Sequence, residues 1–345
     1  MINHSLKNKK LIICYESREK FKESIKKEVD KNTAESWSKF LIDHKSIESI
    51  KNFLVRKGLD TEVLELDNIE RFKKIIDAKG SIDLLLWNIS DGCDIYKGSY
   101  VPSFAKLLNI KFFGSETYAQ YIAQDKFKFV SICEHLDISV PKSILYLYRQ
   151  NNYLPQKPTD IFSKQQFLFI KPNIFDNNIG ILENAKTNIN NLNNNVEELS
   201  NKIESDVLVQ EYIDGFDLRV CFIGDKVDIN KIGVLKIEKY NIETNGSIDF
   251  INESEANKID FKVTKYTNSA ICNNIVADVI KLINSLHLKD YFAFDVRVSK
   301  DETKYYFIEL NTAPFIINRT MDAYAQLFYD KTISKVFYDT IVNSF

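Results

Sequence analysis

The chain has 345 residues, more than an ordinary single domain, so we expect two or three domains that share a large core. A hydrophobic content of 44% and a charged content of 27% are typical of a soluble globular protein, and a net charge of −2 leaves no basic surface for a nucleic acid. The sequence has no apolar leader, no apolar run long enough to cross a membrane, and five scattered cysteines without metal-type spacing, so we expect a cytoplasmic protein with reduced thiols and no membrane partner.

Strands and helices alternate in the first part of the chain. Apolar runs predict strands at 11–16, 61–66 and 83–90, and amphipathic segments predict helices at 46–58, ended by Gly58, and at 71–80. This order predicts a parallel sheet of the doubly wound type. The turn-rich loop 91–99 follows the third strand at its carboxyl end, where open sheets of this type bind ligands.

Two further units are expected, at 115–214 and 215–345. The second begins with a predicted helix over 115–137 and contains an Asn-rich surface loop, 186–206, that leads into another helix. Its short strands are predicted at 138–147, 167–172, 181–184 and 207–213. The third contains the strand DLRVCFIGD (217–225), a helix over about 268–286, a hairpin over 291–315 and a helix after Arg319.

The hairpin YFAFDVRVSKDETKYYFIELNTAPF places carboxylates among aromatic and branched residues. Side chains alternate along a strand, so Asp295 and Arg297 share one face of the first strand. If 300–304 form the loop, Asp295 lies directly opposite Glu309. On the returning strand one face is expected to carry Tyr305, Phe307, Glu309 and Asn311.

Two facing carboxylates destabilise a hairpin unless one takes a proton, a cationic side chain pairs with them, or a metal binds. Asp295, Glu309 and the Asn311 amide supply only oxygen ligands, which suits Mg²⁺. The alternative is an edge hairpin whose Asp and Glu face water. The hairpin alone does not favour either interpretation.

Two lysines upstream support the metal interpretation. Lys171 ends an apolar strand and precedes Pro172, which directs the chain into the loop 174–180. Asn178 and Gly180 tolerate the left-handed conformations with which backbone N–H groups can cover phosphates. Lys126 lies in the preceding predicted helix. Each lysine alone is more often a solvated surface charge, but their order before a carboxylate pair is informative.

Four segments in order resemble the ATP-grasp ligases, within the D-alanine–D-alanine ligase-like branch. They are FFGSETYAQYIAQDK (112–126), IKPNIFDNNIGI (170–181), VLVQEYIDGFDLRV (207–220) and FDVRVSKDETKYYFIELNTAP (294–314), within a similarity that extends over about 83–325. The resemblance implies an α/β ATP-grasp fold. A doubly wound pre-ATP-grasp domain at 1–114 would precede two α+β subdomains, 115–214 and 215–345, that clasp ATP.

The resemblance also implies roles for single residues. Lys126 and Lys171 match the lysines that contact ATP phosphates, and the loop with Asn178 and Gly180 matches the phosphate-covering loop. Gln210 matches a position, usually Glu, that reads the adenine amino group. The remaining matches are the hinge Glu211, Tyr212 and Ile213, the ribose contact Asp217, the magnesium ligands Asp295, Glu309 and Asn311, and Thr320 near the substrate carboxylate.

The expected reaction is ATP-dependent ligation of a carboxylate to an amine through an acylphosphate, with an amino acid or short peptide as substrate. It needs no side-chain nucleophile, and the four dispersed histidines offer no triad. The alternatives are a D-alanine–D-alanine ligase proper, a phosphotransferase, or a catalytically weak ATP-binding protein. Related ligases are often dimers, so a homodimer is a further expectation.

The sequence departs from the family at several positions. Ala293 stands where an arginine usually stabilises the tetrahedral intermediate; Arg297 is our preferred substitute and Arg219 the second choice. Glu19 is the candidate for holding the amine of the first substrate. The segment 247–258 lacks the expected Lys and Tyr, so the substrate is not defined by the sequence.

Overall fold

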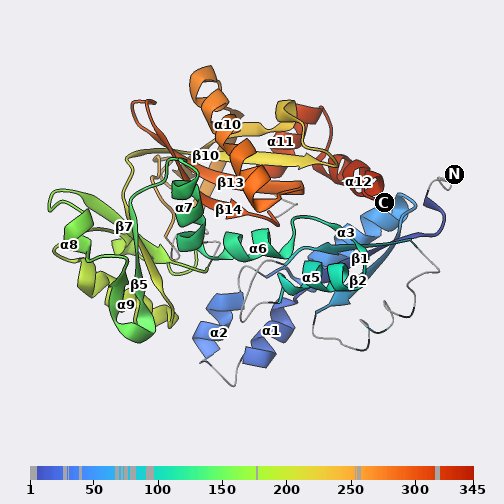
Figure 1. The fold of residues 1–345 in the computed structure, drawn as a ribbon, viewed down its shortest axis with the longest axis horizontal. Coiled ribbons are helices and arrows are strands. Elements are labelled where there is room, and N and C mark those ends of the chain that lie inside the picture. Colours follow the sequence, from blue (N-terminus) through green and yellow to red (C-terminus); the bar gives the residue numbers. More distant parts are fainter. Residues whose placement is uncertain are drawn as a thin grey trace.

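Three sheets organise the described part of the chain in the computed structural model (Figure 1). The N-terminal sheet lies beside the C-terminal end of the chain, and the central sheet lies at the opposite end of the molecule. The third sheet lies between and above them in this view. The structure describes residues 6–25, 29, 31–38, 41–66, 70, 73, 77, 83–90, 97–175, 178–252, 254, 258–314 and 319–345.

The N-terminal sheet is fully parallel, as the alternation of strands and helices predicted. Its strand order is β2-β1-β3-β4, which is doubly wound around β1. The helix predicted at 71–80 falls largely outside the described residues. The elements of this part are β1 (Lys9–Tyr15), α1 (Arg18–Ile25), α2 (Lys31–Trp37), α3 (His44–Arg56), β2 (Asp60–Glu65), β3 (Asp83–Asn88), α5 (Tyr100–Leu107) and β4 (Lys111–Phe113).

The central sheet is antiparallel, with strand order β6-β5-β9-β7-β8. The apolar face of α9 covers it and supplies Leu192, Val196, Leu199 and Ile203 to the core. The elements are α6 (Thr117–Gln124), α7 (Lys126–His135), β5 (Ser143–Leu147), η3 (Tyr148–Gln150), β6 (Asn152–Leu154), α8 (Pro158–Ile161), β7 (Phe167–Pro172), η4 (Glu183–Ala185), β8 (Lys186–Asn188), α9 (Leu192–Ile203) and β9 (Val207–Glu211).

Two predictions in this part are wrong. The single helix expected over 115–137 is two helices, because Asp125 is extended and its side chain caps α7 by accepting from the Lys128 backbone N–H. The strand expected at 181–184 is a 3₁₀ turn, and the strand begins only at Lys186.

The C-terminal sheet is antiparallel, with strand order β12-β11-β10-β13-β14. One face packs on α10, while the other packs on α11 and α12 and shares a core with the N-terminal sheet. In that shared core the Trp87 indole N–H donates to the Tyr291 hydroxyl at 2.8 Å. The elements are β10 (Gly215–Gly224), η5 (Ile229–Lys231), β11 (Gly233–Asn241), β12 (Ile259–Lys265), α10 (Ser269–Leu286), β13 (Asp290–Ser299), β14 (Tyr305–Asn311), α11 (Arg319–Tyr329) and α12 (Ile333–Asn343).

The hairpin β13–β14 has the predicted pairing and one irregularity. Asp295 lies opposite Glu309, as the assumed loop of 300–304 required. A bulge then shifts the register, so that Val296 pairs with Phe307 and Ile308 is the extra residue. The expectation that Phe307 shares the face of Glu309 is therefore wrong: Phe307 is fully buried in the core under α10.

Among the described helices, none combines the length and the apolar character that a membrane crossing requires.

Candidate active site between the central and C-terminal sheets

A cavity of about 750 Å³ lies where the central and C-terminal sheets face each other. It brings together residues that are far apart in the sequence, from Arg18 to Thr320. Of the predicted site residues, Gly180 and Glu19 do not line it. The others do: Lys126, Lys171, Asn178, Gln210, Glu211, Tyr212, Ile213, Asp217, Arg219, Asp295, Arg297, Glu309, Asn311 and Thr320.

Gly180 has a structural reason for its identity. Its φ is +72°, and a Cβ at this position would lie 2.6 Å from the Pro172 side chain. The backbone therefore excludes other residues here, whether or not the glycine contacts a ligand.

The acidic centre of the cavity consists of Asp295 and Glu309 on neighbouring strands, with Asn311 two residues further along β14. Burial raises the pKa of Asp295 to about 7, since the nearby Glu309 charge adds to the burial effect and Arg219 only partly opposes it. Burial would also raise the pKa of Glu309, but the ammonium groups of Lys126 and Lys171 outweigh it and lower that pKa to about 2. The Asn311 side-chain nitrogen is buried without a partner among the described residues.

Cationic side chains approach this centre from both sheets. Lys126 is the first residue of α7. Its ammonium group lies 3.7 Å from the Glu309 Oε2 and donates to the Phe175 carbonyl at 2.7 Å. Lys171 is the last residue but one of the apolar strand β7, and it is almost fully buried in the cavity wall. On β10, Arg219 pairs with Asp295 in register, and its Nη1 donates to both carboxylate oxygens at 2.9 and 3.2 Å.

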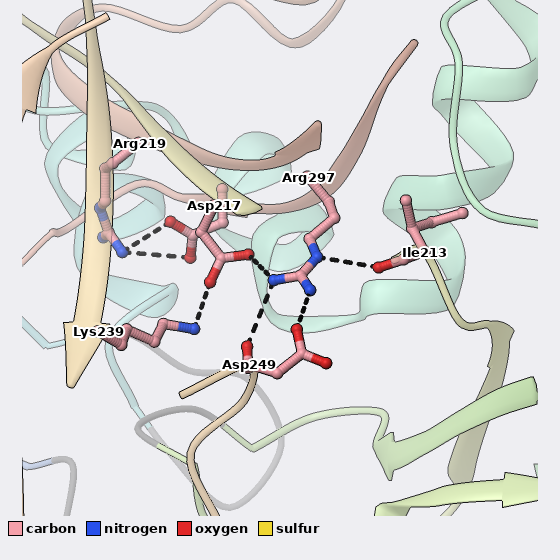
Figure 2. A network of polar contacts seen from close by, with 7 residues as sticks. Ile213, Asp217, Arg219, Lys239, Asp249 and Arg297 are labelled. Atoms are coloured by element: carbon pink, nitrogen blue, oxygen red, sulfur yellow. Dashed lines mark hydrogen bonds and ion pairs between the residues drawn. The ribbon is translucent and has the colours of Figure 1, made fainter. Parts of the chain in front are cut away.

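Arg297 makes a set of contacts separate from that of Arg219 in the same cavity (Figure 2). Its Nε donates to the Ile213 carbonyl at 3.1 Å and its Nη1 to Asp217 at 2.7 Å, while its Nη2 pairs with Asp249. Lys239 pairs with the other Asp217 oxygen. Burial alone would raise the pKa of Asp217, but Lys239 and Arg297 outweigh it and hold that pKa below its ordinary value. Arg297 therefore contacts the hinge and the carboxylates beside it, whereas Arg219 contacts the acidic centre.

Asp249 lies in the connection between β11 and β12, and with its neighbours Phe250 and Ile251 it lines the cavity. Its carboxylate contacts Arg297 of the C-terminal sheet and lies 4.0 Å from the Lys186 ammonium of the central sheet. The next residue, Phe250, packs edge-on against Phe169 of β7 at a centroid distance of 5.3 Å. This connection thus joins the two sheets at the hinge end of the cavity.

Aromatic rings line the hinge end of the cavity beside the ion pairs of Arg297 with Asp217 and Asp249. Phe169 and Gln210 are register partners on β7 and β9, and both line the cavity. Glu211 points its carboxylate toward the Gln166 side chain and the Lys142 backbone N–H, at 2.9 and 3.1 Å. Lys186 lies 3.8 Å above the ring of Tyr212.

At the other end, the cavity reaches the N-terminal sheet. Thr320, at the start of α11, lines it there, together with Arg18 and Asp43. Glu19, the sequence candidate for the substrate amine, is exposed and does not line it. Asp43 is a carboxylate that sequence reasoning missed, since its side chain also caps α3 and such a residue is usually explained by capping alone.

Lys239 and Asp249 were missed as well. Lys239 follows the alternation of β11 in GVLKIEKYN, which could have placed it on the face of Asp217. Asp249 lies in an irregular connection, and no local pattern indicates its partner.

Comparison with known proteins gives a family and a fold. A family model described as D-ala D-ala ligase C-terminus matches residues 133–337. The comparison with curated proteins gives no match. The VanG D-Ala:D-Ser ligase of Enterococcus faecalis superposes with a TM-score of 0.66 at 15% identity, over 98% of this chain and 99% of that one.

Two further solved structures agree. The D-alanine–D-alanine ligase of Bacillus anthracis complexed with ATP gives a TM-score of 0.66 at 15% identity, over 97% of both chains. The D-alanyl-alanine synthetase A of Vibrio cholerae gives 0.64 at 13% identity, over 98% of both. The predicted α/β ATP-grasp fold is confirmed.

Proposed function

The chain belongs to the family of the D-alanine–D-alanine ligase C-terminus, and on that premise we propose that it joins a carboxylate to an amine at the expense of ATP. One observation carries the proposal: a facing carboxylate pair, two lysines and an arginine meet in one cavity whose other end is aromatic. A triphosphate with its metal ion suits the charged end, and a nucleobase suits the aromatic end.

Asp295, Glu309 and Asn311 are the proposed Mg²⁺ ligands. Their donor set fits a hard cation, because two carboxylates and an amide offer oxygen atoms on adjacent strands. The raised pKa of Asp295 reflects the cost of two like charges side by side in a partly buried site, a cost that a divalent cation lowers. When bound, Mg²⁺ supplies charge neutralisation for the phosphates.

Lys126 and Lys171 are the proposed phosphate contacts. Both are nearly buried, both lower the pKa of Glu309, and they approach it from a helix start and a strand end. Asp217, held by Lys239 and Arg297, presents an ionised carboxylate for ribose hydroxyls. The hinge of Glu211, Tyr212 and Ile213 lies beside the base.

The proposed reaction has two steps. A carboxylate oxygen of the first substrate attacks the γ-phosphorus, and the bond between this phosphorus and the β-phosphate oxygen breaks. ADP departs, and the first substrate is now an acylphosphate. The amine of the second substrate, having lost a proton, then attacks the acyl carbon, and inorganic phosphate departs as the amide forms. The chain's residues align the groups and stabilise negative charge, which supplies most of the rate in phosphoryl transfer.

Arg219 is the proposed cation for that charge. Sequence reasoning preferred Arg297, but the contacts favour Arg219, because Arg219 is fixed on Asp295 and Arg297 is engaged by Asp217, Asp249 and the hinge carbonyl. Arg297 is a positioning residue in this proposal. Thr320 contacts the substrate carboxylate.

The test is an ADP-release screen over pairs of D- and L-amino acids and short peptides, with mass spectrometry of the products. ADP, phosphate and an amide support the ligase. ADP with a phosphoester identifies a phosphotransferase instead, and nucleotide binding without ADP release over the whole screen contradicts an enzyme. A D-alanine–D-alanine ligase proper would form its dipeptide as the preferred product.

A further inference from the structure

The side chain of Gln210 is held by one neighbour. In the central sheet Gln210 lies between its register partners Ser143 on β5 and Phe169 on β7. Gln210 is buried, with 3% of its surface exposed to solvent. The Gln210 side-chain nitrogen, Nε2, donates to the Ser143 hydroxyl oxygen at 2.9 Å.

The hydroxyl of Ser143 fixes the direction of this hydrogen bond. Its oxygen lies 2.7 Å from the Pro141 carbonyl oxygen, which can only accept, so the single hydroxyl hydrogen is directed there. The Ser143 oxygen can then act only as an acceptor toward Gln210. The amide must therefore turn its nitrogen to Ser143 and its oxygen away from it.

The oxygen of the Gln210 amide is left for the cavity. Among the described residues, no protein group donates a hydrogen bond to this oxygen. The oxygen is also not one of the fully buried polar atoms that lack a partner, and Gln210 lines the cavity. An amide oxygen in this place accepts a hydrogen bond and cannot donate one.

This acceptor lies at the end of the cavity that suits a nucleobase. Phe169, beside Gln210, and Lys171, beside the acidic centre, are two residues apart on β7 and line the same cavity. A nucleotide with its phosphates at Lys171 therefore directs its base toward Phe169 and Gln210. At the purine 6-position adenine carries an amino donor, whereas guanine carries a carbonyl acceptor.

We propose, resting on the proposed nucleotide-dependent function, that Ser143 determines nucleobase specificity by locking the Gln210 amide as an acceptor. Ser143 acts as a positioning residue. With the lock in place, the oxygen of Gln210 accepts from the adenine amino group and opposes the guanine carbonyl. Without the lock, the amide can rotate and offer its nitrogen to guanine.

The test is calorimetric titration of the full-length protein with the magnesium complexes of two non-hydrolysable nucleotides, the β,γ-imido analogues of ATP and GTP. The unaltered protein should bind the ATP analogue about tenfold to a hundredfold more tightly, the range expected for one mismatched buried hydrogen bond. Ser143→Ala should reduce this ratio by about tenfold, chiefly through tighter binding of the GTP analogue.

Two control variants separate the lock from a merely structural effect. Ser143→Thr keeps the hydroxyl on a strand that tolerates β-branching, and should keep the ratio. In the double variant Ser143→Ala with Gln210→Glu there is no amide to rotate, so the carboxylate accepts in either orientation and discrimination should return. A structural role of Ser143 would weaken both nucleotides equally and leave the double variant as poor as the single one.

The outcomes distinguish this inference from the function on which it rests. If Ser143→Ala keeps the original ratio, or if the unaltered protein binds both analogues equally, the inference is wrong and the proposed ligase stands. If the unaltered protein binds neither analogue, both fail. If Ser143→Ala does not fold, the comparison of Ser143→Thr with Ser143→Cys, a much weaker hydrogen-bonding group, decides: equal ratios in the two overturn the inference.

Discussion

Replacing Arg219 by methionine should nearly abolish turnover while leaving the nucleotide bound. Methionine keeps much of the side-chain volume and removes the guanidinium, which donates to both oxygens of Asp295. A fixed donor aimed at developing charge contributes a factor of about 10²–10³ in rate, or about 2.7–4 kcal/mol of the barrier. We expect a loss of that size in kcat.

The position of the two arginines explains why the matched change at Arg297 should behave differently. Arg297 is two residues beyond Asp295 on β13, about 7 Å along the strand, and its guanidinium is turned to Asp217, Asp249 and the Ile213 carbonyl. Arg297→Met should therefore weaken ATP binding through the ribose contact and reduce kcat less than Arg219→Met does.

Coupled ADP-release kinetics and calorimetry with Mg·ATP measure the two effects separately. Arg219→Lys restores a positive charge with fewer fixed donors and should recover part of the lost rate. Thermal unfolding of each variant controls for a loss of folded structure. The control is needed because removing Arg219 leaves the facing carboxylates Asp295 and Glu309 with one cation fewer. Normal turnover in Arg219→Met, with the large loss in Arg297→Met instead, would refute the reasoning.

Four further variants test other parts of the structure. Lys171→Ala should weaken Mg·ATP binding markedly and Glu309→Gln should abolish Mg²⁺-dependent turnover, as calorimetry and ADP release would show. Asp249→Asn should weaken ATP binding about two- to fivefold without changing kcat, because a partly exposed ion pair at the hinge end is lost. Asp290→Asn should stabilise the fold above pH 6: burial raises the pKa of Asp290 to about 6, so its ionised form destabilises the folded state there.

The Asp290 prediction has a defined sign and size. The unfolded pKa is about 3.9, so between pH 4 and 6 the folded state binds more protons and stability falls as pH rises, by about 3 kcal/mol at most. Asparagine can still accept from the Gly114 N–H and tolerates the positive φ of 61°. Denaturant unfolding should show a gain at pH 8 that vanishes at pH 4. A gain independent of pH would contradict a titration effect. For the other three variants, unchanged Mg·ATP affinity in both Lys171→Ala and Glu309→Gln, or lost turnover in Asp249→Asn, would contradict the proposed roles.

The sequence predicted the carboxylate pair of the hairpin because two local rules were sufficient. Alternation assigned the faces of β13, and the loop length assigned the register, so Asp295 could be placed opposite Glu309. The bulge at Ile308 was not predictable in this way. An extra residue in one strand leaves no local pattern, and Phe307 enters the core because the tertiary packing under α10 accepts it.

Side-chain partners were predictable only where a short loop joins the strands that carry them. Alternation placed Arg297 on the face of Asp295, but its contacts with Asp217 and Asp249 depend on strands and a connection that are distant in sequence. The same limit explains why Asp43 was missed, because the N-terminal sheet brings it to the cavity from the other end of the chain. The lysines were found through their order along the chain.

The absence of an arginine at position 293 has a structural explanation in the register of β10 and β13. Ala293 is fully buried between its neighbours Cys221 and Asn311, in the core that the C-terminal and N-terminal sheets share, and this packing leaves no room for a long side chain. One alternation further along, β10 offers Arg219 directly opposite Asp295. On the proposed assignment, the transition state needs a positive charge beside the reacting group. Arg219 on the neighbouring strand β10 can supply that charge as well as an arginine on β13, the strand of Asp295, could.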